Sequence, residues 1–271
     1  MTRIFYFLLG GIILFFLLSF FLNNFVFNQV PEQIADPILT LEKKNKQIFN
    51  IDTDIGSDVE YLLGKLNYKD DNRFIEVFLE NSSKHEIYLR EETYQAFQQM
   101  AQDAKEDGIN LNIILGARSF ADQKTIWENK WSGVVGNYYL IKDEHNKTEA
   151  ILKHSSMPGT SRHHWGTDID LNNLQNSYFE KGEGLEVYNW LIQNAFNYGF
   201  CQPYSAFGES RLNGHQEEKW HWTHIPISID LTRQYFSLIK PSDLNGFLGD
   251  NLVLELNIID NYVLGVNKEC L

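Results

Sequence analysis

The sequence predicts an α+β protein: a small, mostly antiparallel sheet flanked by helices and preceded by one N-terminal transmembrane helix. Three observations support this. The first is an uncharged apolar run at the N-terminus. The second is a series of amphipathic segments at helical spacing that alternate with short strand-like runs. The third is a composition with 43% hydrophobic and 14% aromatic residues, which is enough to bury a core in 271 residues.

The N-terminal run extends from Ile4 to Leu22 without a charge, and a bilayer-spanning helix needs about 20 such residues. Arg3 precedes it, which favours a cytoplasmic N-terminus. We expect an uncleaved signal anchor over 1–27, with one pass through the inner membrane and the rest of the chain on the periplasmic side. A cleaved signal peptide is an alternative, although no A-x-A pattern follows the run. A buried core helix is another.

The next residues, 28–72, mix short apolar patches with charge and are interpreted as a stalk or peripheral segment. A compact domain is predicted over 73–240, followed by a C-terminal extension over 241–271. No tandem repeat or low-complexity tract interrupts this organisation.

The first elements of the domain are a helix, a strand and a second helix. Residues 91–105 have apolar side chains at helical spacing and stop before Gly108. Residues 111–115 form a short strand-like run. A helix is then predicted through about Trp131, with Ser119 as its N-cap.

The middle of the domain is less regular. Residues 133–146 are a loop or hairpin, and 148–155 form a short helix. A strand is predicted over 167–171. An amphipathic helix over 184–198 follows, with Gly199 as its C-cap.

The last elements are a strand over 220–225, a helix from about Leu231 and an apolar strand near 252–256. Together these elements predict an α+β class with a small, mostly antiparallel sheet.

The acidic net charge argues against nucleic acid as a partner. The net charge is −13 and the sequence pI is about 5.0, whereas binding to nucleic acid needs clustered Lys and Arg. The two cysteines, Cys201 and Cys270, leave two readings open. They are separate packed thiols, or a disulfide if the domain lies in an oxidising compartment.

Two stretches carry the residue types of a metal site. His163 lies in a loop near Gly166, which allows the chain to turn, and Asp170 follows on the predicted strand. Further on, His221 offers a second imidazole and Glu218 a second carboxylate. Imidazole and carboxylate are good zinc ligands, and three protein ligands leave a position open for water. Zinc lowers the pKa of that water, and a free carboxylate can take its proton.

One geometric condition must hold. Residues 218 and 221 point to opposite faces of an extended chain, so a bend between them is needed if both are to face one metal.

Three motifs in order resemble one family. PGTSRHHWGTDIDL is similar to the S-x-H-x-x-G-x-x-x-D signature of the D-alanyl-D-alanine carboxypeptidases of peptidase family M15, which include VanY-type and LD-carboxypeptidase enzymes. EKWHW resembles the E-x-W-H motif of that family, and Gly116 to Gln123 resembles its (Y/A)RS-x-x-x-Q element. The motifs extend over about Leu111 to Ile225, so both ends of the chain lie outside the resemblance.

The resemblance implies a fold of the DD-peptidase and hedgehog type and a zinc cofactor. It implies His163, Asp170 and His221 as zinc ligands and Glu218 as the catalytic base. It also implies Arg118 as a catalytic, substrate-facing cation. Gln123 and Ser161 would line the same site.

One position departs from the family pattern. The family usually has a small residue two positions before the ligand aspartate, where this chain has Asp168. On a strand Asp168 and Asp170 share a face, so Asp168 either supports a ligand histidine or competes as a ligand. His164 and His224 are assigned no role.

The expected function is removal of a terminal D-Ala from peptidoglycan stem peptides. An endopeptidase of the same family and a non-catalytic zinc-binding module are the alternatives. The peptidoglycan stem peptide and the inner membrane, contacted through residues 4–22, are the expected partners. The sequence does not indicate an oligomeric state.

Overall fold

The computed structural model describes residues 59–82 and 84–271. The predicted transmembrane run 4–22, and with it the signal anchor 1–27, lies outside the described residues. Within the described part of the chain, no helix combines the length and the apolar character needed to cross a membrane.

The centre of the described part is a four-stranded antiparallel sheet with the order β3-β4-β6-β5. A separate antiparallel pair, β1 and β2, lies beside it. This arrangement confirms the predicted mixed class with a small antiparallel sheet. The strands are β1 (Phe74–Glu76), β2 (Tyr88–Arg90), β3 (Ile113–Leu115), β4 (Asp168–Leu171), β5 (Phe200–Cys201) and β6 (His221–His224).

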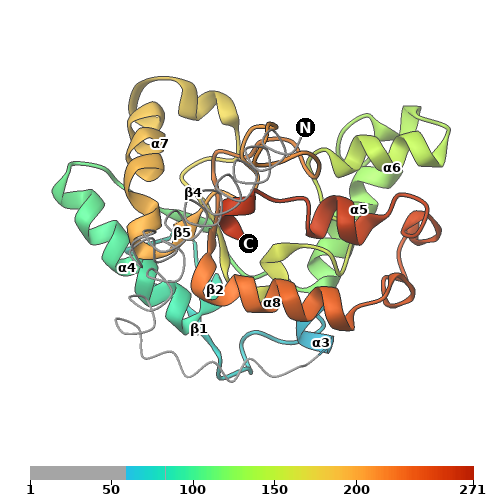
Figure 1. Cartoon of the computed structure of the whole chain (residues 1–271), viewed down its shortest axis with the longest axis horizontal. Coiled ribbons are helices and arrows are strands. Elements are labelled where there is room, and N and C mark those ends of the chain that lie inside the picture. The colour runs from blue at the N-terminus through green and yellow to red at the C-terminus, as the bar shows by residue number, and fades with distance from the viewer. Residues whose placement is uncertain (1–58, 83) are drawn as a thin grey trace, which may run out of the picture. The chain divides into compact units, whose positions relative to one another are not determined.

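Helices surround the sheet (Figure 1), with α4 and α7 on one side and α5 and α6 on the other. Short 3₁₀ turns connect many of the elements, including Arg162–Trp165 directly before β4. The helices are α3 (Val59–Leu62), α4 (Glu91–Glu106), α5 (Phe120–Ser132), α6 (Glu144–Leu152), α7 (Gly182–Asn194) and α8 (Ile225–Leu238). The other turns are Tyr138–Leu140, Asn176–Glu180, Ala195–Tyr198, Pro241–Asp243, Asp250–Leu252, the π turn Ile259–Val263 and Lys268–Cys270.

The predicted helix 91–105 is confirmed as α4, and the helix predicted after Ser119 is confirmed as α5. Ser119 caps α5, because its hydroxyl accepts from the backbone N–H of Asp122 while the Asp122 carboxylate accepts from Ser119. α7 is also confirmed, although its last turn is 3₁₀ and ends at Gly199 with φ 79°. The predicted helix 148–155 begins earlier, at Glu144, because Asp143 caps it.

The strand predicted near 252–256 is wrong. Residues 250–252 form a 3₁₀ turn, and 253–257 continue in turns. Leu256 follows Leu252 by four residues and Val253 by three, so a helix-like backbone buries all three on one side. In an extended strand they could not share a face.

The main core cluster lies between α3, α5, α6, α8 and the C-terminal residues. Tyr61 and Leu62 of α3 are fully buried in it, so the part of the predicted stalk from Val59 to Leu66 packs with the domain. Phe247 and Val263, from the predicted C-terminal extension, belong to the same cluster.

A disulfide joins Cys201 of β5 to Cys270, which selects one of the two readings left open by the sequence. It holds the C-terminus against the edge of the central sheet.

Candidate metal centre

Three predicted ligands converge in the structure. His163, Asp170 and His221 each offer one ligand atom, and these atoms all lie within 4.8 Å of one another. All three side chains are buried. Among the described residues this is the only such group of three or more. Their roles as ligands stay predictions.

The sheet brings two of them together. β4 and β6 are antiparallel neighbours, and their register places Asp170 directly opposite His221. Side chains directly opposite each other on one face have Cβ atoms about 5 Å apart, close enough to share an ion. Asp168 lies on the same face of β4, opposite Thr223.

His163 comes from the 3₁₀ turn before β4. Its Nδ1–H donates to the carbonyl of Gly116 at 2.8 Å, since a carbonyl can only accept. This leaves Nε2 facing Asp170 Oδ1 at 3.4 Å. Gly166 ends the turn with φ 69°, as the prediction of a turning loop requires. A Cβ there would lie 2.3 Å from the ring of Phe74.

His221 is oriented by Asp168. Its Nε2–H donates to Asp168 Oδ2 at 2.9 Å, so Nδ1 is directed to the centre, 3.2 Å from Asp170 Oδ1. Burial by itself lowers the pKa of His221. The hydrogen bond to Asp168, together with the close carboxylates of Asp170 and Glu218, outweighs burial and raises that pKa well above its usual value.

Asp168 is itself held by a buried network. Arg162 Nε donates to its Oδ2 at 3.0 Å, and Thr223 Oγ1 donates to its Oδ1 at 2.8 Å. Burial raises the pKa of Asp168, but the charge of Arg162 and the hydrogen bond from His221 hold it well below its usual range. Asp168 therefore orients His221, one of the candidate ligands, and its own oxygens are occupied by this network. Sequence reasoning missed Arg162, because nothing marks it as a buried partner.

The donor set fits a zinc ion. Asp170 Oδ1 is buried and has no hydrogen-bond donor in acceptable geometry, although both imidazoles face it. Burying a carboxylate oxygen without a hydrogen-bond partner costs free energy unless a bound cation compensates its charge. Two imidazole nitrogens and one carboxylate oxygen form a three-ligand set that leaves a coordination position open.

Glu218 lies beside this centre. A turn over 218–221, closed by the His221 N–H donating to the Glu218 carbonyl, provides the predicted bend between them. Glu218 Oε2 then lies 3.3 Å from His221 Nδ1. The backbone N–H of Glu218 donates to the Tyr204 carbonyl, which fixes the turn against its neighbouring loop.

The centre opens into a cavity of about 420 Å³ that Arg118, Ser161 and Glu218 line. Arg118 Nη1 donates to Gln123 Oε1 at 2.7 Å, and Gln123 Nε2 donates to the Ser156 carbonyl at 2.6 Å. Gln123 is fully buried, so it orients Arg118 rather than lining the cavity. The structure thus brings Arg118 and Ser161 to the metal centre.

Sequence reasoning missed other residues that line this cavity, among them Lys130, Tyr204 and His215. The ring of Tyr204 packs against His221 at 4.8 Å and against His215 at 5.0 Å. His215 Nδ1–H donates to the Leu152 carbonyl at 2.5 Å, and its Nε2 lies 3.0 Å from Ser156 Oγ. Only Lys130 had a sequence signal, seven residues after Gln123 on one helix.

The two histidines given no role face away from the ligand group. His164 Nδ1–H donates to the Arg118 carbonyl, and its Nε2 accepts from Gly159 N–H. Burial lowers the pKa of His164 to about 3. His224 packs under α4, where its Nδ1 lies 3.2 Å from Thr93 Oγ1.

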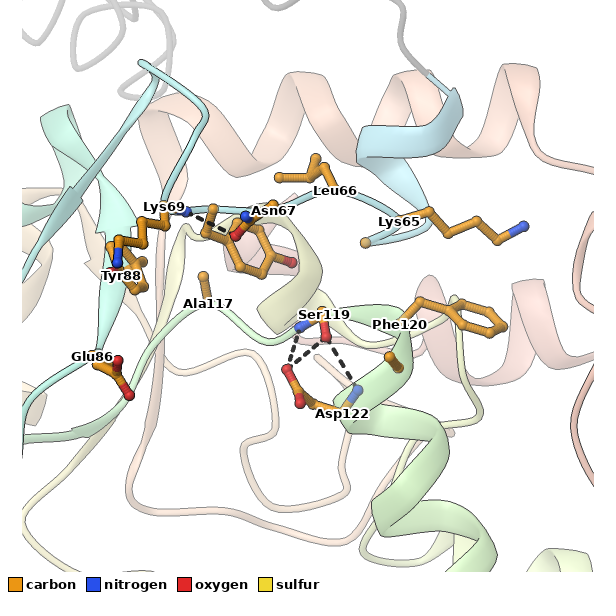
Figure 2. A pocket seen from close by; sticks show the side chains of 13 residues that line it. Lys65, Leu66, Asn67, Lys69, Glu86, Tyr88, Ala117, Ser119, Phe120 and Asp122 are labelled. Atoms are coloured by element: carbon orange, nitrogen blue, oxygen red, sulfur yellow. Dashed lines mark hydrogen bonds between the residues drawn. The ribbon is translucent and has the colours of Figure 1, made fainter.

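A second hollow of about 700 Å³ lies behind the segment that carries Arg118. Ala117 and Ser119 line it, whereas Arg118 lines the metal-site cavity, because successive residues of an extended chain point to opposite sides. Figure 2 shows the Ser119 and Asp122 cap within this hollow, with Lys65 and Lys69 towards its two ends. The candidate metal ligands are not part of it.

Three converging candidate ligands beside a glutamate, on a small antiparallel sheet, are the arrangement expected of single-metal hydrolases. Residues 86–227, just over half of the chain, match the family model of VanY, D-alanyl-D-alanine carboxypeptidase. The chain belongs to this carboxypeptidase family, as the three motifs predicted.

Curated proteins similar to this chain are also named as carboxypeptidases. It is 30% identical over 164 residues to a putative carboxypeptidase, YodJ, of Bacillus subtilis, a match that covers 56% of this chain and 55% of that protein. It is 28% identical over 124 residues to a D-alanyl-D-alanine carboxypeptidase of Enterococcus faecalis, covering 46% and 43%. The chain spans about half the length of the curated relatives it matches.

Solved structures are also similar. An LdcB LD-carboxypeptidase is 24% identical, with a TM-score of 0.47 over 63% of this chain and 79% of that one. A VanY D,D-pentapeptidase in complex with Zn(II) is 22% identical, with a TM-score of 0.45 over 63% and 89%.

Proposed function

We propose that this protein is a zinc-dependent carboxypeptidase that removes the terminal D-Ala of peptidoglycan stem peptides. The observation that carries the proposal is the convergence of His163, Asp170 and His221 beside Glu218, in a chain of the VanY family. The relative named as a D-alanyl-D-alanine carboxypeptidase supports the choice of substrate.

In this proposal His163 Nε2, Asp170 Oδ1 and His221 Nδ1 hold the zinc ion. When bound, a zinc ion with three protein ligands supplies a Lewis acid that polarises a carbonyl and acidifies water. The protein residues have separate tasks. The Gly116 carbonyl and Asp168 keep the two imidazoles in the tautomers that direct the correct nitrogens inwards.

Glu218 is the proposed general base. Its carboxylate lies at the centre without being one of the three converging ligands. It takes a proton from the attacking water and delivers it to the amine that leaves as the peptide bond breaks. The turn over 218–221 holds it within reach of that water.

Arg118 is the proposed partner of the substrate's terminal carboxylate. A guanidinium binds a carboxylate through two parallel hydrogen bonds, and Gln123 fixes its orientation. Ser161 is 4% exposed and lines the cavity, and its hydroxyl does not cap the 3₁₀ turn that follows. It is therefore available to bind substrate.

The test is mass spectrometry of muropeptides incubated with the zinc-loaded protein and with its Glu218→Gln variant. Wild type should release single D-Ala residues, and the variant should lose about 10²- to 10⁴-fold in rate while keeping its zinc. Cuts within the stem or the cross-bridge would indicate an endopeptidase instead. Zinc binding without cleavage by either protein would favour the non-catalytic module.

We also propose that residues 4–22 anchor the protein in the inner membrane with the 73–240 domain on the periplasmic side. The uncharged apolar run and the preceding Arg3 support this. The disulfide is consistent with an oxidising compartment. Fractionation of cells that produce the full chain, with and without residues 1–27, tests it. Recovery of both forms in the soluble fraction would contradict it.

A further inference from the structure

Lys130 places a second positive charge in the metal-site cavity. It lies on α5 seven residues after Gln123, which is about two turns, so the two side chains lie on the same side of the helix. Lys130 lines the cavity together with Arg118 and Glu218. Lys130 lies outside the three sequence motifs that resemble the family.

The ammonium group of Lys130 is not used by the protein as an ion-pair partner. Its one close polar contact is the carbonyl of His154, at 3.4 Å. No carboxylate of residues 59–82 or 84–271 lies within 4.0 Å of it. By contrast, Lys124 of the same helix pairs with Glu128 at 3.9 Å.

Lys130 is also partly withdrawn from water. Burial lowers its pKa, while the charge of Glu218 raises that pKa and the charge of Arg118 lowers it. The three charges therefore act on one another across the same cavity. A partly buried ammonium without a carboxylate partner is costly, and an anionic ligand removes that cost.

The spacing along α5 limits which part of a ligand reaches Lys130. From Gln123, which accepts a hydrogen bond from Arg118, to Lys130 the helix rises about 10 Å over seven residues. An extended peptide advances about 3.3 Å per residue. A peptide that has its terminal carboxylate at Arg118 and extends through the cavity towards Lys130 therefore reaches it within about three residues of its end. Ser155 and Ser156 also line the cavity, and Ser155 adjoins the His154 carbonyl that contacts Lys130.

We propose that Lys130 recognises a second carboxylate, carried by a residue of the peptide upstream of the cleaved bond. This inference rests on the proposed function and specifies its substrate class. Among stem peptides it favours those whose diamino acid carries a side-chain carboxylate, such as diaminopimelate, over those with lysine. Arg118 then binds the terminal carboxylate, and Lys130 binds the side-chain carboxylate of the upstream residue.

The test measures binding, so that it does not depend on turnover. Two synthetic peptides end in D-Ala-D-Ala and differ only in the preceding residue, which is diaminopimelate or lysine. Each is titrated calorimetrically into the full chain, zinc-loaded and carrying Glu218→Gln to prevent cleavage. The diaminopimelate peptide should bind about fivefold more tightly, and the difference should shrink with added salt.

Variants assign the preference to Lys130. Adding Lys130→Met should abolish the difference without weakening the lysine peptide, and Lys130→Arg should keep it. Lys124→Met, a matched loss of charge on α5 outside the cavity, should also keep it. Equal binding of the two peptides, no binding of either, or a preference that survives Lys130→Met would each overturn the inference.

Cleavage of the two peptides by the wild-type protein is measured in a separate experiment, which tests the proposed function. A binding preference that depends on Lys130, without cleavage of either peptide, would support the inference while contradicting the proposed function. Cleavage of both peptides at equal kcat/KM, together with equal binding, would contradict the inference alone.

Discussion

At the scale of single residues, the candidate site depends on the orientation of two imidazole rings. The Gly116 carbonyl and the Asp168 carboxylate each accept one ring N–H, so the remaining nitrogens of His163 and His221 are directed at Asp170. Asp168 is in turn bound by Arg162 and Thr223 in a fully buried network. The departure from the family pattern at position 168 thus has a structural explanation.

Replacing Asp168 with Asn should weaken zinc binding by about 10- to 100-fold, because the amide no longer stabilises the ring tautomer of His221. Competition with a zinc-binding dye measures this affinity. The same change leaves the buried charge of Arg162 unpaired, so the free energy of unfolding should fall by about 3–5 kcal/mol. Asp230→Asn, at an exposed ion pair on α8, is the control and should alter neither quantity measurably. Unchanged zinc affinity in Asp168→Asn would contradict the orienting role.

At the scale of elements, the site sits where short segments end. His163 lies in a 3₁₀ turn before β4, Glu218 in a turn before β6, and Arg118 directly before the N-cap of α5. The sheet register sets the pairing of Asp170 and His221, while caps and turns set the other positions. Changes in these caps and turns should therefore affect the site as well as stability.

Ser119→Ala removes the N-cap of α5 and should lower the free energy of unfolding by about 1 kcal/mol. Because Arg118 precedes the cap and Gln123 follows it, KM should also rise. Thr125→Ala, whose hydroxyl bonds only to its own helix, is the control and should stay within about 0.5 kcal/mol. Urea unfolding and steady-state kinetics measure both effects. A stability equal to that of wild type would show that the cap is dispensable.

Gly166→Ala tests the turn that positions His163. The left-handed φ of 69° alone should cost about 1 kcal/mol, and the added Cβ would also collide with the ring of Phe74. Gly108→Ala has a similar φ of 81° with open space around the added Cβ, so it isolates the backbone cost. Thermal unfolding should show the larger loss for Gly166→Ala, with weaker zinc binding in that variant only. Equal losses would mean that the Phe74 contact relaxes freely.

At the scale of the described domain, the C-terminal residues belong to the scaffold of the site. Val263 lies in the main core, and Tyr262 packs against His215, which lines the metal-site cavity. Cys270 is bonded to Cys201 on β5, and β5 is paired with β6, which carries His221. The C-terminal segment therefore supports the site through its disulfide to β5 and its contact with His215.

Loss of the disulfide should lower the free energy of unfolding by about 4 kcal/mol, because the bond closes a loop with a sequence separation of 69 residues. Urea unfolding with and without reductant measures this. The double variant Cys201→Ser, Cys270→Ser should match the reduced wild type and should not respond to reductant. A wild-type stability that is unaffected by reductant would contradict the prediction.

Much of the local structure was predictable because it depends on neighbours in sequence. α4, α5 and α7 follow from helical spacing and from the residues at their ends, such as Ser119 and Gly199. β1, β2 and β5 were missed, since strands of two or three residues are too short to show a period. The strand near 252–256 was wrong because an apolar run does not by itself distinguish an extended from a coiled backbone.

The sequence by itself determined the residue types, order and spacing of the three motifs, and with them the family and the candidate ligands. Only the tertiary structure decided that Asp170 lies opposite His221, that Asp168 and Arg162 orient the ring, and that Lys130 shares a cavity with Arg118. The physical reason is the separation along the chain of the residues that interact. Spacing along a chain specifies local conformation, whereas contacts between residues about fifty positions apart arise from sheet register and core packing.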